Sequence, residues 1–563
     1  MQNTSIITSS TDRTQIPVID VFAGPGGLGE GFASVTCSDN SFKRRFKIAL
    51  SIEKDPFAHQ TLLLRTFLRQ FPLNGLPDEY YDFLAGKIKS VKELFALYPT
   101  EFALAQEQAW KAILGFDRDV KGVDTSEIDE RIRKAINGAD KWVLIGGPPC
   151  QAYSIVGRAR NKGINPKDPR VYLYREYYRI LAVHRPAVFV MENVKGLLSS
   201  KVENDHIFTQ IINDLENPYV AYEALDGQAL SQAEHPGYKL FSLVKPSKFG
   251  NLFGRQKLDQ RDFLIESEKF GIPQKRHRLI ILGIRNDLVR DLEIELLQEK
   301  KAISVREAIG DLPAVRSQLS GKKGDVSDND SNWVSSILKG INSAQLWKGV
   351  DGDTISCIKR TSEQIIIPKY NKGSNYIDFS ARPTYNSEWY TDPKLIGVCN
   401  HETRSHMSED LLRYLFAACY TQVKGRFPHL GDYPRALLPA HKNVFEAVHL
   451  GKFSDRFCVQ SWDEPSRTVT SHISKDGHYY IHPDPTQCRS MTVREAARIQ
   501  TFPDNYYFCG PRTAQFHQVG NAVPPFLAFQ IAEIVRNLLR QITVDSVCST
   551  GKAKESTAAL QSV

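Results

Sequence analysis

One cysteine in this chain of 563 residues stands in surroundings that are typical of a nucleophile. Cys150 ends the run Gly-Gly-Pro-Pro-Cys, which directly follows the apolar segment 142–145. The two prolines restrict the backbone ahead of the thiol, and two cations, Arg158 and Arg160, follow closely. Positive charge near a thiol lowers its pKa and increases the share of thiolate, the nucleophilic form. Burial as a small apolar side chain is the usual alternative for a free cysteine, and the polar neighbours favour the nucleophile.

An acid and a basic run could support that nucleophile. Glu192 directly follows an apolar run, and an acid at the end of a buried strand is costly unless it is paired or serves a site. Residues 274–278 precede another apolar run, and within them Arg276 and Arg278 alternate, so that both would lie on one side of an extended chain. A salt-bridged glutamate and a solvated basic face are the structural alternatives. Together, the thiol, the acid and the guanidinium groups indicate covalent catalysis on an electron-poor ring.

A glycine-rich loop near the N-terminus could hold a cofactor. Residues 24–29 match the pattern GxGxxG, and Glu53 comes 24 residues after the last glycine, close to the spacing of a carboxylate that binds a ribose. Glycines let the backbone approach a ligand, and the N-terminus of a following helix favours an anionic group. On its own, the loop is equally consistent with a tight strand-to-helix turn that binds nothing.

Four short apolar runs must position these motifs, at residues 18–22, 142–145, 188–191 and 279–282. Continuous apolarity is typical of strands that are buried on both faces of a helix-covered parallel sheet. Between them lie helix-like stretches, such as 102–114 with its apolar stripe. The pattern predicts an α/β fold with a doubly wound, mostly parallel sheet. If the fourth strand runs antiparallel to the others, its basic start lies at the same edge as the cysteine and the acid.

Composition excludes several other classes of protein. The 72 Lys and Arg against 64 Asp and Glu leave a net charge of +8, and no apolar run approaches the ~18 residues of a membrane span. Nine cysteines without a CxxC pair indicate a reduced, cytoplasmic protein. His401-Glu402 and His406 are five residues apart, whereas the zinc-protease motif needs histidines four apart. We therefore interpret them as a polar loop and expect no metal site and no membrane.

The motifs, in their order along the chain, closely resemble those of the DNA (cytosine-5)-methyltransferase family. The matching segments are 20–27, 148–151, 192–194, 274–278, 467–470, 492–495 and 518–525. The resemblance implies a Rossmann-like fold that uses S-adenosyl-L-methionine. It also implies that the acceptor is C5 of a cytosine flipped out of a specific sequence in double-stranded DNA, as in bacterial restriction-modification systems.

The resemblance also implies roles for individual residues. Cys150 would add to C6 of the cytosine, Glu192 would contact N3, and Arg276 and Arg278 would position the base and its backbone. The implied cofactor-binding residues are Phe22, Gly24, Gly26, Gly27, Glu53, Pro149, Asn521 and Val523. The acid that contacts the adenine in this family has no clear match, and Asp124 is one candidate.

Composition along the chain and the resemblance together suggest a domain organisation. The expected parts are a flexible leader at 1–15, a catalytic and cofactor-binding domain at 16–290 with a helical insertion at about 65–135, a smaller, loop-rich target-recognition domain at 291–500, a C-terminal segment at 501–543 that returns to the catalytic domain, and a tail at 544–563. We expect a monomer in the bacterial cytoplasm, associated with the nucleoid. A companion restriction endonuclease is implied by the family alone. The DNA sequence that is recognised cannot be read from the side chains.

Three other functions compete with this one. An RNA (tRNA) cytosine-5 methyltransferase would use the same chemistry, but the long segment 290–460 favours DNA, because reading a duplex sequence needs extra surface. An NAD-dependent oxidoreductase would leave Cys150, Glu192 and the arginines without roles. A non-catalytic DNA-binding relative would not need the catalytic set. The charge also favours a nucleic acid, since residues 151–185 carry 8 Lys and Arg against 2 acids and residues 239–285 carry 11 against 4.

Overall fold

The computed structural model describes most of the chain. The described residues are 15–37, 43–117, 120–149, 173–199, 201–202, 205–226, 235–246, 259–290, 292–321, 327–440, 444 and 454–559. The side chains of 116–117, 201–202, 205–206 and 224–226 and of all residues after 542 are outside this description. Cys150, with the residues that follow it up to 172, also lies outside the described residues.

A central sheet organises the larger lobe, with the strand order β10-β13-β7-β6-β1-β2-β3 and with β11 paired to β13. Its strands are β1 (Ile16–Val21), β2 (Phe46–Glu53), β3 (Ala109–Lys111), β6 (Val143–Gly146), β7 (Val188–Val194), β10 (Tyr238–Phe241), β11 (Leu264–Glu266) and β13 (His277–Arg285). The five strands from β3 to β7 are parallel, while β13 is antiparallel to β7 and β10 to β13. The structure therefore confirms the predicted α/β fold with a mostly parallel sheet, and β13 begins at the edge where the parallel strands end.

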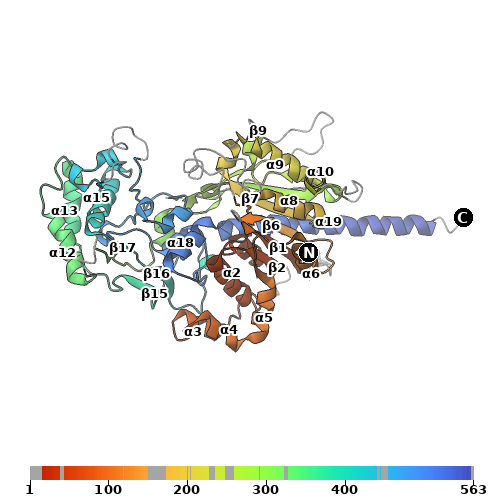
Figure 1. The fold of residues 1–563 in the computed structure, drawn as a ribbon, viewed down its shortest axis with the longest axis horizontal. Helices are drawn as coiled ribbons and strands as arrows, with labels where there is room; N and C mark the ends of the chain where they lie inside the picture. Colours follow the sequence, from red (N-terminus) through yellow and green to blue (C-terminus); the bar gives the residue numbers. More distant parts are fainter. Residues whose placement is uncertain are drawn as a thin grey trace, which may run out of the picture.

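Helices cover both faces of this sheet, as Figure 1 shows. One face packs against α1 (Gly27–Ala33) and α19 (Pro525–Ala559). The other packs against α6 (Thr125–Ile136), α8 (Tyr174–His184) and α9 (Ile207–Glu216), with α10 (Pro218–Asp226) beside α8. The continuous apolar runs of the strands follow from this double burial, because neither face meets water.

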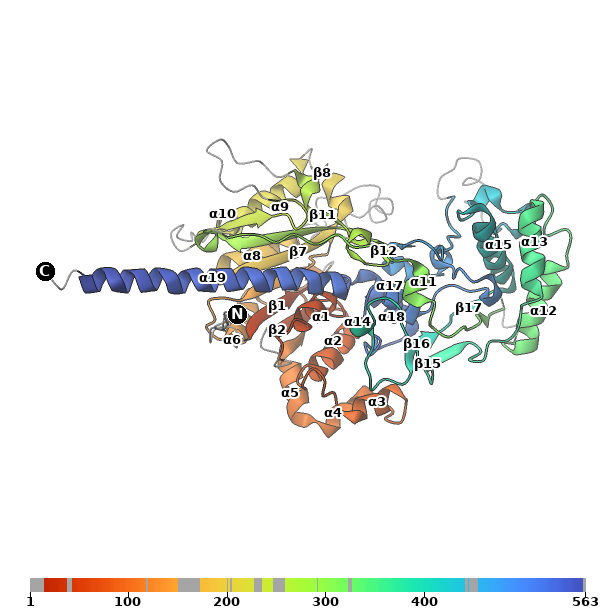
Figure 2. The same cartoon turned by 180° about the vertical axis from the view of Figure 1, so that it is seen from behind.

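The long helix α19 crosses the back of the larger lobe and projects beyond it (Figure 2). It continues to Ala559, and so it takes in most of the segment expected to be a tail. By length and composition, the helical stretch Arg512–Ile542 could span a membrane, with a mean hydropathy of 1.2. Since 72% of its apolar window is buried inside the protein, its apolarity is accounted for by packing against the sheet.

The segment expected to be a helical insertion is helical only in part. It contains α3 (Asp78–Leu84), α4 (Val91–Leu97) and α5 (Pro99–Gln108), which follow α2 (Pro56–Leu68). The prediction of one helix over 102–114 is wrong at its C-terminal end, because β3 pairs with β2 as a strand of the central sheet. A small hairpin, β4 (Phe116–Asp117) with β5 (Val120–Lys121), then precedes α6. Long-range strand pairing overrides the local helical period here.

The second lobe lies apart from the sheet and has its own apolar core (Figure 1). Its helices are α12 (Asp330–Ile341), α13 (Gly352–Ser362) and α15 (Ser408–Lys424). Short paired strands accompany them, namely β14 (Gln318–Leu319) with β17 (Ser405–His406) and β15 (Gly373–Ile377) with β16 (Val398–Glu402). A segment that reads as loop-rich in sequence thus contains three packed helices.

The interpretation of His401 and His406 as parts of a polar loop is wrong. Both side chains are buried, on β16 and β17. His401 Nδ1 lies 2.8 Å from Thr492 Oγ1, and His401 Nε2 lies 2.9 Å from the carbonyl oxygen of Pro313. These are structural histidines whose ring nitrogens are both used within the fold.

Several short elements join the two lobes. They are β12 (Gln274–Lys275) paired with β18 (Ser466–Arg467), α11 (Val305–Ile309), α14 (Ser387–Tyr390), α17 (Val493–Ile499) and α18 (Arg512–Asn521). The remaining hairpin of the larger lobe is β8 (Lys201–Val202) with β9 (Asp205–His206). Residues 305–309 and 469–522 share one apolar cluster, so the later sequence motifs lie together against the edge of the sheet where β13 begins.

Candidate active site

The glycine loop between β1 and α1 adopts a backbone that few side chains tolerate. Phe22, Gly24 and Gly26 have φ angles of 56°, 59° and 97°, which lie in the left-handed region. A Cβ on Gly24 would meet no atom within 4 Å, whereas one on Gly26 would lie 3.0 Å from Leu62 and 3.2 Å from the Tyr506 hydroxyl. The loop is therefore packed tightly on the protein side at Gly26 and faces open space at Gly24.

Glu53 is held beside this loop at the end of β2. The backbone N–H of Gly24 donates to Glu53 Oε2 at 2.7 Å, and the N–H of Asp55 donates to Oε1 at 2.7 Å. Burial raises the pKa of the Glu53 carboxyl, while these backbone donors act in the opposite direction. A third backbone N–H, that of Lys54, also bonds to this carboxylate, and since its two oxygens offer about four lone-pair sites, it can still accept a hydrogen bond.

The segment near residue 523 closes over the same loop, although almost 500 residues separate the two in sequence. A Cβ on Gly27 would lie 2.3 Å from the carbonyl oxygen of Val523, so only glycine allows this approach. Asn521, at the end of α18, is exposed, and its Nδ2 lies 3.2 Å from His517 Nδ1. The structure thus brings Val523 to the glycine loop, while the side chain of Asn521 contacts its own helix.

The end of β6 lies next to the glycine loop. Gly146 pairs with Val21, and Pro149, which is half-buried, is the last described residue before Cys150. A Cβ on Gly147 would lie 2.9 Å from Glu192 Oε2. The backbone that leads into Cys150 therefore passes directly against the carboxylate at the end of β7.

Glu192 and Arg278 form an ion pair between β7 and β13. Arg278 Nε lies 2.9 Å from Glu192 Oε1, and both side chains keep a small exposed fraction, 14% and 13%. Ile280 is opposite Glu192 in the antiparallel register, so Arg278, two residues earlier, shares its face of the sheet. An acid and a guanidinium group therefore meet, accessible to a ligand, beside the segment that carries the cysteine.

Arg276 lies apart from this pair. It comes between β12 and β13, its side chain is only 2% exposed, and its Nη1 donates to the carbonyl oxygens of Val469 at 2.7 Å and Gly520 at 3.3 Å. These contacts tie the sheet edge to two later motifs. A role of Arg276 in positioning a base stays a prediction.

Two further acids near the loop were given no role by the sequence analysis. Asp20, the first residue of the glycine-loop motif, is fully buried, and burial raises its pKa to about 7, against the opposing charge of Arg69. Burial would also raise the pKa of Glu30, but Arg65 and Arg69 outweigh it and hold the pKa at about 2. Gly147 and Tyr506 were likewise missed, because their contacts involve residues distant in sequence.

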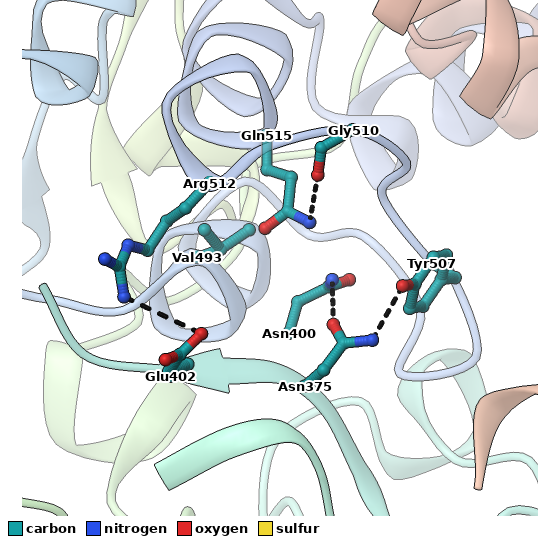
Figure 3. A pocket seen from close by; sticks show the side chains of 8 residues that line it. All are labelled: Asn375, Asn400, Glu402, Val493, Tyr507, Gly510, Arg512 and Gln515. Atoms are coloured by element: carbon teal, nitrogen blue, oxygen red, sulfur yellow. Dashed lines mark hydrogen bonds and ion pairs between the residues drawn. The ribbon is translucent and has the colours of Figure 1, made fainter. Parts of the chain in front are cut away.

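A separate polar cavity of about 230 Å³ lies between β15 and β16 of the second lobe and the joining helices α17 and α18. Figure 3 shows Asn375 joined to Asn400 and to Tyr507 along one wall, with Arg512 and Glu402 facing each other along another. It contains none of the residues expected at the catalytic site. Within the part of the chain that the structure describes, there is also no group of three or more His, Cys, Asp or Glu residues that could hold a metal ion.

Comparison with known proteins identifies related sequences over nearly the whole chain. Residues 91–223 and 263–537 match the family described as C-5 cytosine-specific DNA methylase. The chain is 30% identical over 535 residues to the type II methyltransferase M.Bpa9945I of Bacillus paralicheniformis, covering 93% of this chain and 99% of the relative. It is 25% identical over 435 residues to the DNA (cytosine-5-)-methyltransferase M.ApeKI of Aeropyrum pernix, covering 72% and 83%.

Among solved structures, the chain resembles a DNA modification methyltransferase encoded within a prophage of Escherichia coli. The TM-score is 0.45, with 18% sequence identity, over 93% of this chain and 100% of the other. The names of the two sequence relatives describe a type II methyltransferase and a DNA methyltransferase, and they do not favour the RNA alternative.

Proposed function

Since the chain belongs to the C-5 cytosine-specific DNA methylase family and is a methyltransferase, we propose that it transfers the methyl group of S-adenosyl-L-methionine to C5 of a cytosine in duplex DNA. The observation that carries this proposal is the Glu192–Arg278 pair, which lies against the backbone leading into Cys150. The glycine loop and Glu53 lie at the same sheet edge.

The residues around the glycine loop fit this cofactor. Gly24 leaves open space above the loop, which suits the close approach of a ligand to the backbone. The fixed carboxylate of Glu53 can accept a hydrogen bond from a ribose hydroxyl. Phe22 offers an aromatic surface at the start of the loop, and Gly27 and Val523 complete its base. Bound there, S-adenosyl-L-methionine would supply a methyl group that is electrophilic because it is attached to a sulfonium.

The catalytic roles follow from the chemistry of the cytosine ring. Cys150, as a thiolate, would add to C6, and the addition makes C5 electron-rich. Glu192 would hold a proton at N3 and so stabilise the charge that the addition places on the ring. Arg278 fixes the Glu192 carboxylate from one side and would place its positive charge beside the base. Once C5 carries the methyl group, release of the C5 proton to water or another base and of Cys150 as its thiolate would restore the aromatic ring.

Duplex DNA is the substrate that the surroundings support. A cytosine stacked in a duplex cannot reach a cysteine at the sheet edge, so it must be flipped out at a cost of a few kcal/mol. The basic segments 151–185 and 239–285 flank the motifs of the site in sequence, and phosphate contacts there would offset that cost. The second lobe supplies the additional surface that sequence recognition requires.

The experiment that tests the proposal uses tritiated S-adenosyl-L-methionine with a duplex DNA library and, separately, with tRNA. We expect label in DNA, at C5 of cytosine. We expect Cys150→Ala to bind the cofactor and to transfer no methyl group, while the control Cys37→Ala stays active. Label in tRNA alone would contradict the choice of substrate, and transfer by Cys150→Ala would contradict the covalent step. The monomeric state, the location in the cell and the companion endonuclease stay predictions from the family relation.

A further inference from the structure

A side-chain junction at Asn505 joins three parts of the chain that are far apart in sequence. Its Nδ2 donates to Asp392 Oδ2 at 2.7 Å, and its Oδ1 accepts from Arg65 Nη1 at 3.3 Å. Its carbonyl oxygen accepts from the hydroxyl of Tyr80 at 2.6 Å. One half-buried residue thus contacts α2, α3 and the segment that leads into β16.

Through Tyr506 and Arg65, this junction is connected to the glycine loop. The hydroxyl of Tyr506, the next residue, donates to the carbonyl oxygen of Pro25. Arg65 binds Glu30 on α1 at 2.5 and 3.0 Å, and its guanidinium group lies over the Tyr506 ring at 4.8 Å. The position of Asn505 is therefore tied to the loop that we assign to the cofactor.

Through Asp392, the junction is also connected to the segment that leads into β16 of the second lobe. Asp392 also accepts from the hydroxyl of Tyr81 at 2.7 Å. Two residues on, Lys394 pairs with Asp78 at 2.7 Å, and soon afterwards the chain enters β16, which holds His401. Around the same segment, Trp389 Nε1 donates to the carbonyl oxygen of Thr501 at 2.8 Å. Helix α3 and the segment near Thr501 thus both bind the stretch of chain that leads into β16.

We propose that Asn505 is a positioning residue for methyl transfer, which holds the glycine loop and the entry to the second lobe in one fixed relation through its bond to Asp392. The inference rests on the proposed function, in which the loop binds the methyl donor and the second lobe helps to place the DNA. Methyl transfer needs the reacting atoms aligned, and a misplacement of ~1 Å caused by a distant change can lower a rate by ~100-fold.

A substitution can break the bond of Asn505 to Asp392 while it keeps the bond to Arg65. Asn505→Asp keeps an acceptor for Arg65 but removes the donor that binds Asp392 and sets two carboxylates against each other. We expect its single-turnover rate of methyl transfer to fall by about tenfold through misalignment, with the dissociation constants for S-adenosylhomocysteine and for a duplex substrate within about twofold of the wild type. A purely structural role would instead lower the melting temperature without this separation of rate from affinity.

Rescue and control variants make the test specific. In Asn505→Asp/Asp392→Asn, the amide and the carboxylate exchange places, so the hydrogen bond can form again and the rate should recover. Lys87→Ala removes an exposed ion pair with Asp82 that takes no part in the junction and should leave the rate unchanged. An Asn505→Asp rate equal to that of the wild type, or a double variant that is no faster than the single one, would overturn the inference. A wild type that methylates no DNA would instead overturn the proposed function.

Discussion

Arg278 Nε lies 2.9 Å from Glu192 Oε1, across the junction of the last parallel strand of the sheet with its antiparallel neighbour. The two residues are 86 positions apart in sequence, and antiparallel pairing alone brings them to one edge. Because each keeps some exposure, the pair is held in place and can still meet a substrate. The parallel strands β1, β2 and β6 end at this edge, beside the glycine loop, and this makes it the candidate active site.

Replacement of Arg278 tests what the pair contributes. Arg278→Lys removes the planar guanidinium that faces Glu192, and a lysine ammonium cannot reproduce its geometry. We expect single-turnover methyl transfer to fall by about 100-fold, the usual cost of losing a group that stabilises developing charge. Arg285→Lys, at the opposite end of β13, is the matched control and should keep its activity. Equal rates in the two variants would remove Arg278 from the site.

Gly147 tests the close approach of the cysteine segment to Glu192. A Cβ at this position would lie 2.9 Å from Glu192 Oε2, and Arg278 holds that carboxylate in place, so Gly147→Ala must shift either the acid or the backbone before Cys150. We expect a loss of methyl-transfer rate of about tenfold or more, with the melting temperature little changed. Gly352→Ala is the control, because a Cβ there meets nothing within 4 Å. Full activity of Gly147→Ala would show that the spacing is not needed.

Arg276 separates a structural role from a catalytic one. Its Nη1 serves two buried carbonyl oxygens, so Arg276→Met should destabilise the protein by about 3 kcal/mol, since each unsatisfied buried acceptor costs roughly 1–3 kcal/mol. Urea unfolding measures this loss. Unchanged stability together with a large loss of rate would favour the role in base positioning that the family resemblance suggests.

His401 predicts a dependence of stability on pH. Burial lowers its pKa from 6.5 to about 4, so the neutral ring is the native form and the unfolded chain binds the proton more readily. Its contribution to the free energy of unfolding is complete above pH 6.5 and is lost as the pH falls toward 4, by up to about 3 kcal/mol, since one pKa unit corresponds to about 1.4 kcal/mol. Unfolding of the wild type and of His401→Asn, compared between pH 7 and pH 4.5, measures this difference. Parallel curves for the two proteins would contradict the assignment.

Much of the fold could be predicted from local pattern. The four apolar runs lie in four strands of the central sheet, because residues buried on both faces of a sheet are mostly apolar. The prediction of one helix over 102–114 was wrong, because strand pairing with β2 stabilises residues 109–111 more than a continuation of α5 would. The helices of the second lobe were missed, since short apolar islands in a polar segment give a weak period.

The sequence by itself determined which reactive side chains are present and which short segments form buried strands. Both follow from residue type and local apolarity, which are properties of short segments. Only the tertiary structure decided which groups meet. Arg276 and Arg278 look equivalent in sequence, yet Arg276 lies where β12 pairs with β18 and is buried against Val469 and Gly520, whereas Arg278 lies within β13 and reaches Glu192. Likewise, no local pattern links Asn505 to Asp392 or Tyr506 to Pro25. Those contacts arise because packing brings distant segments together, and the residues of a short segment do not specify which distant segment will pack against them.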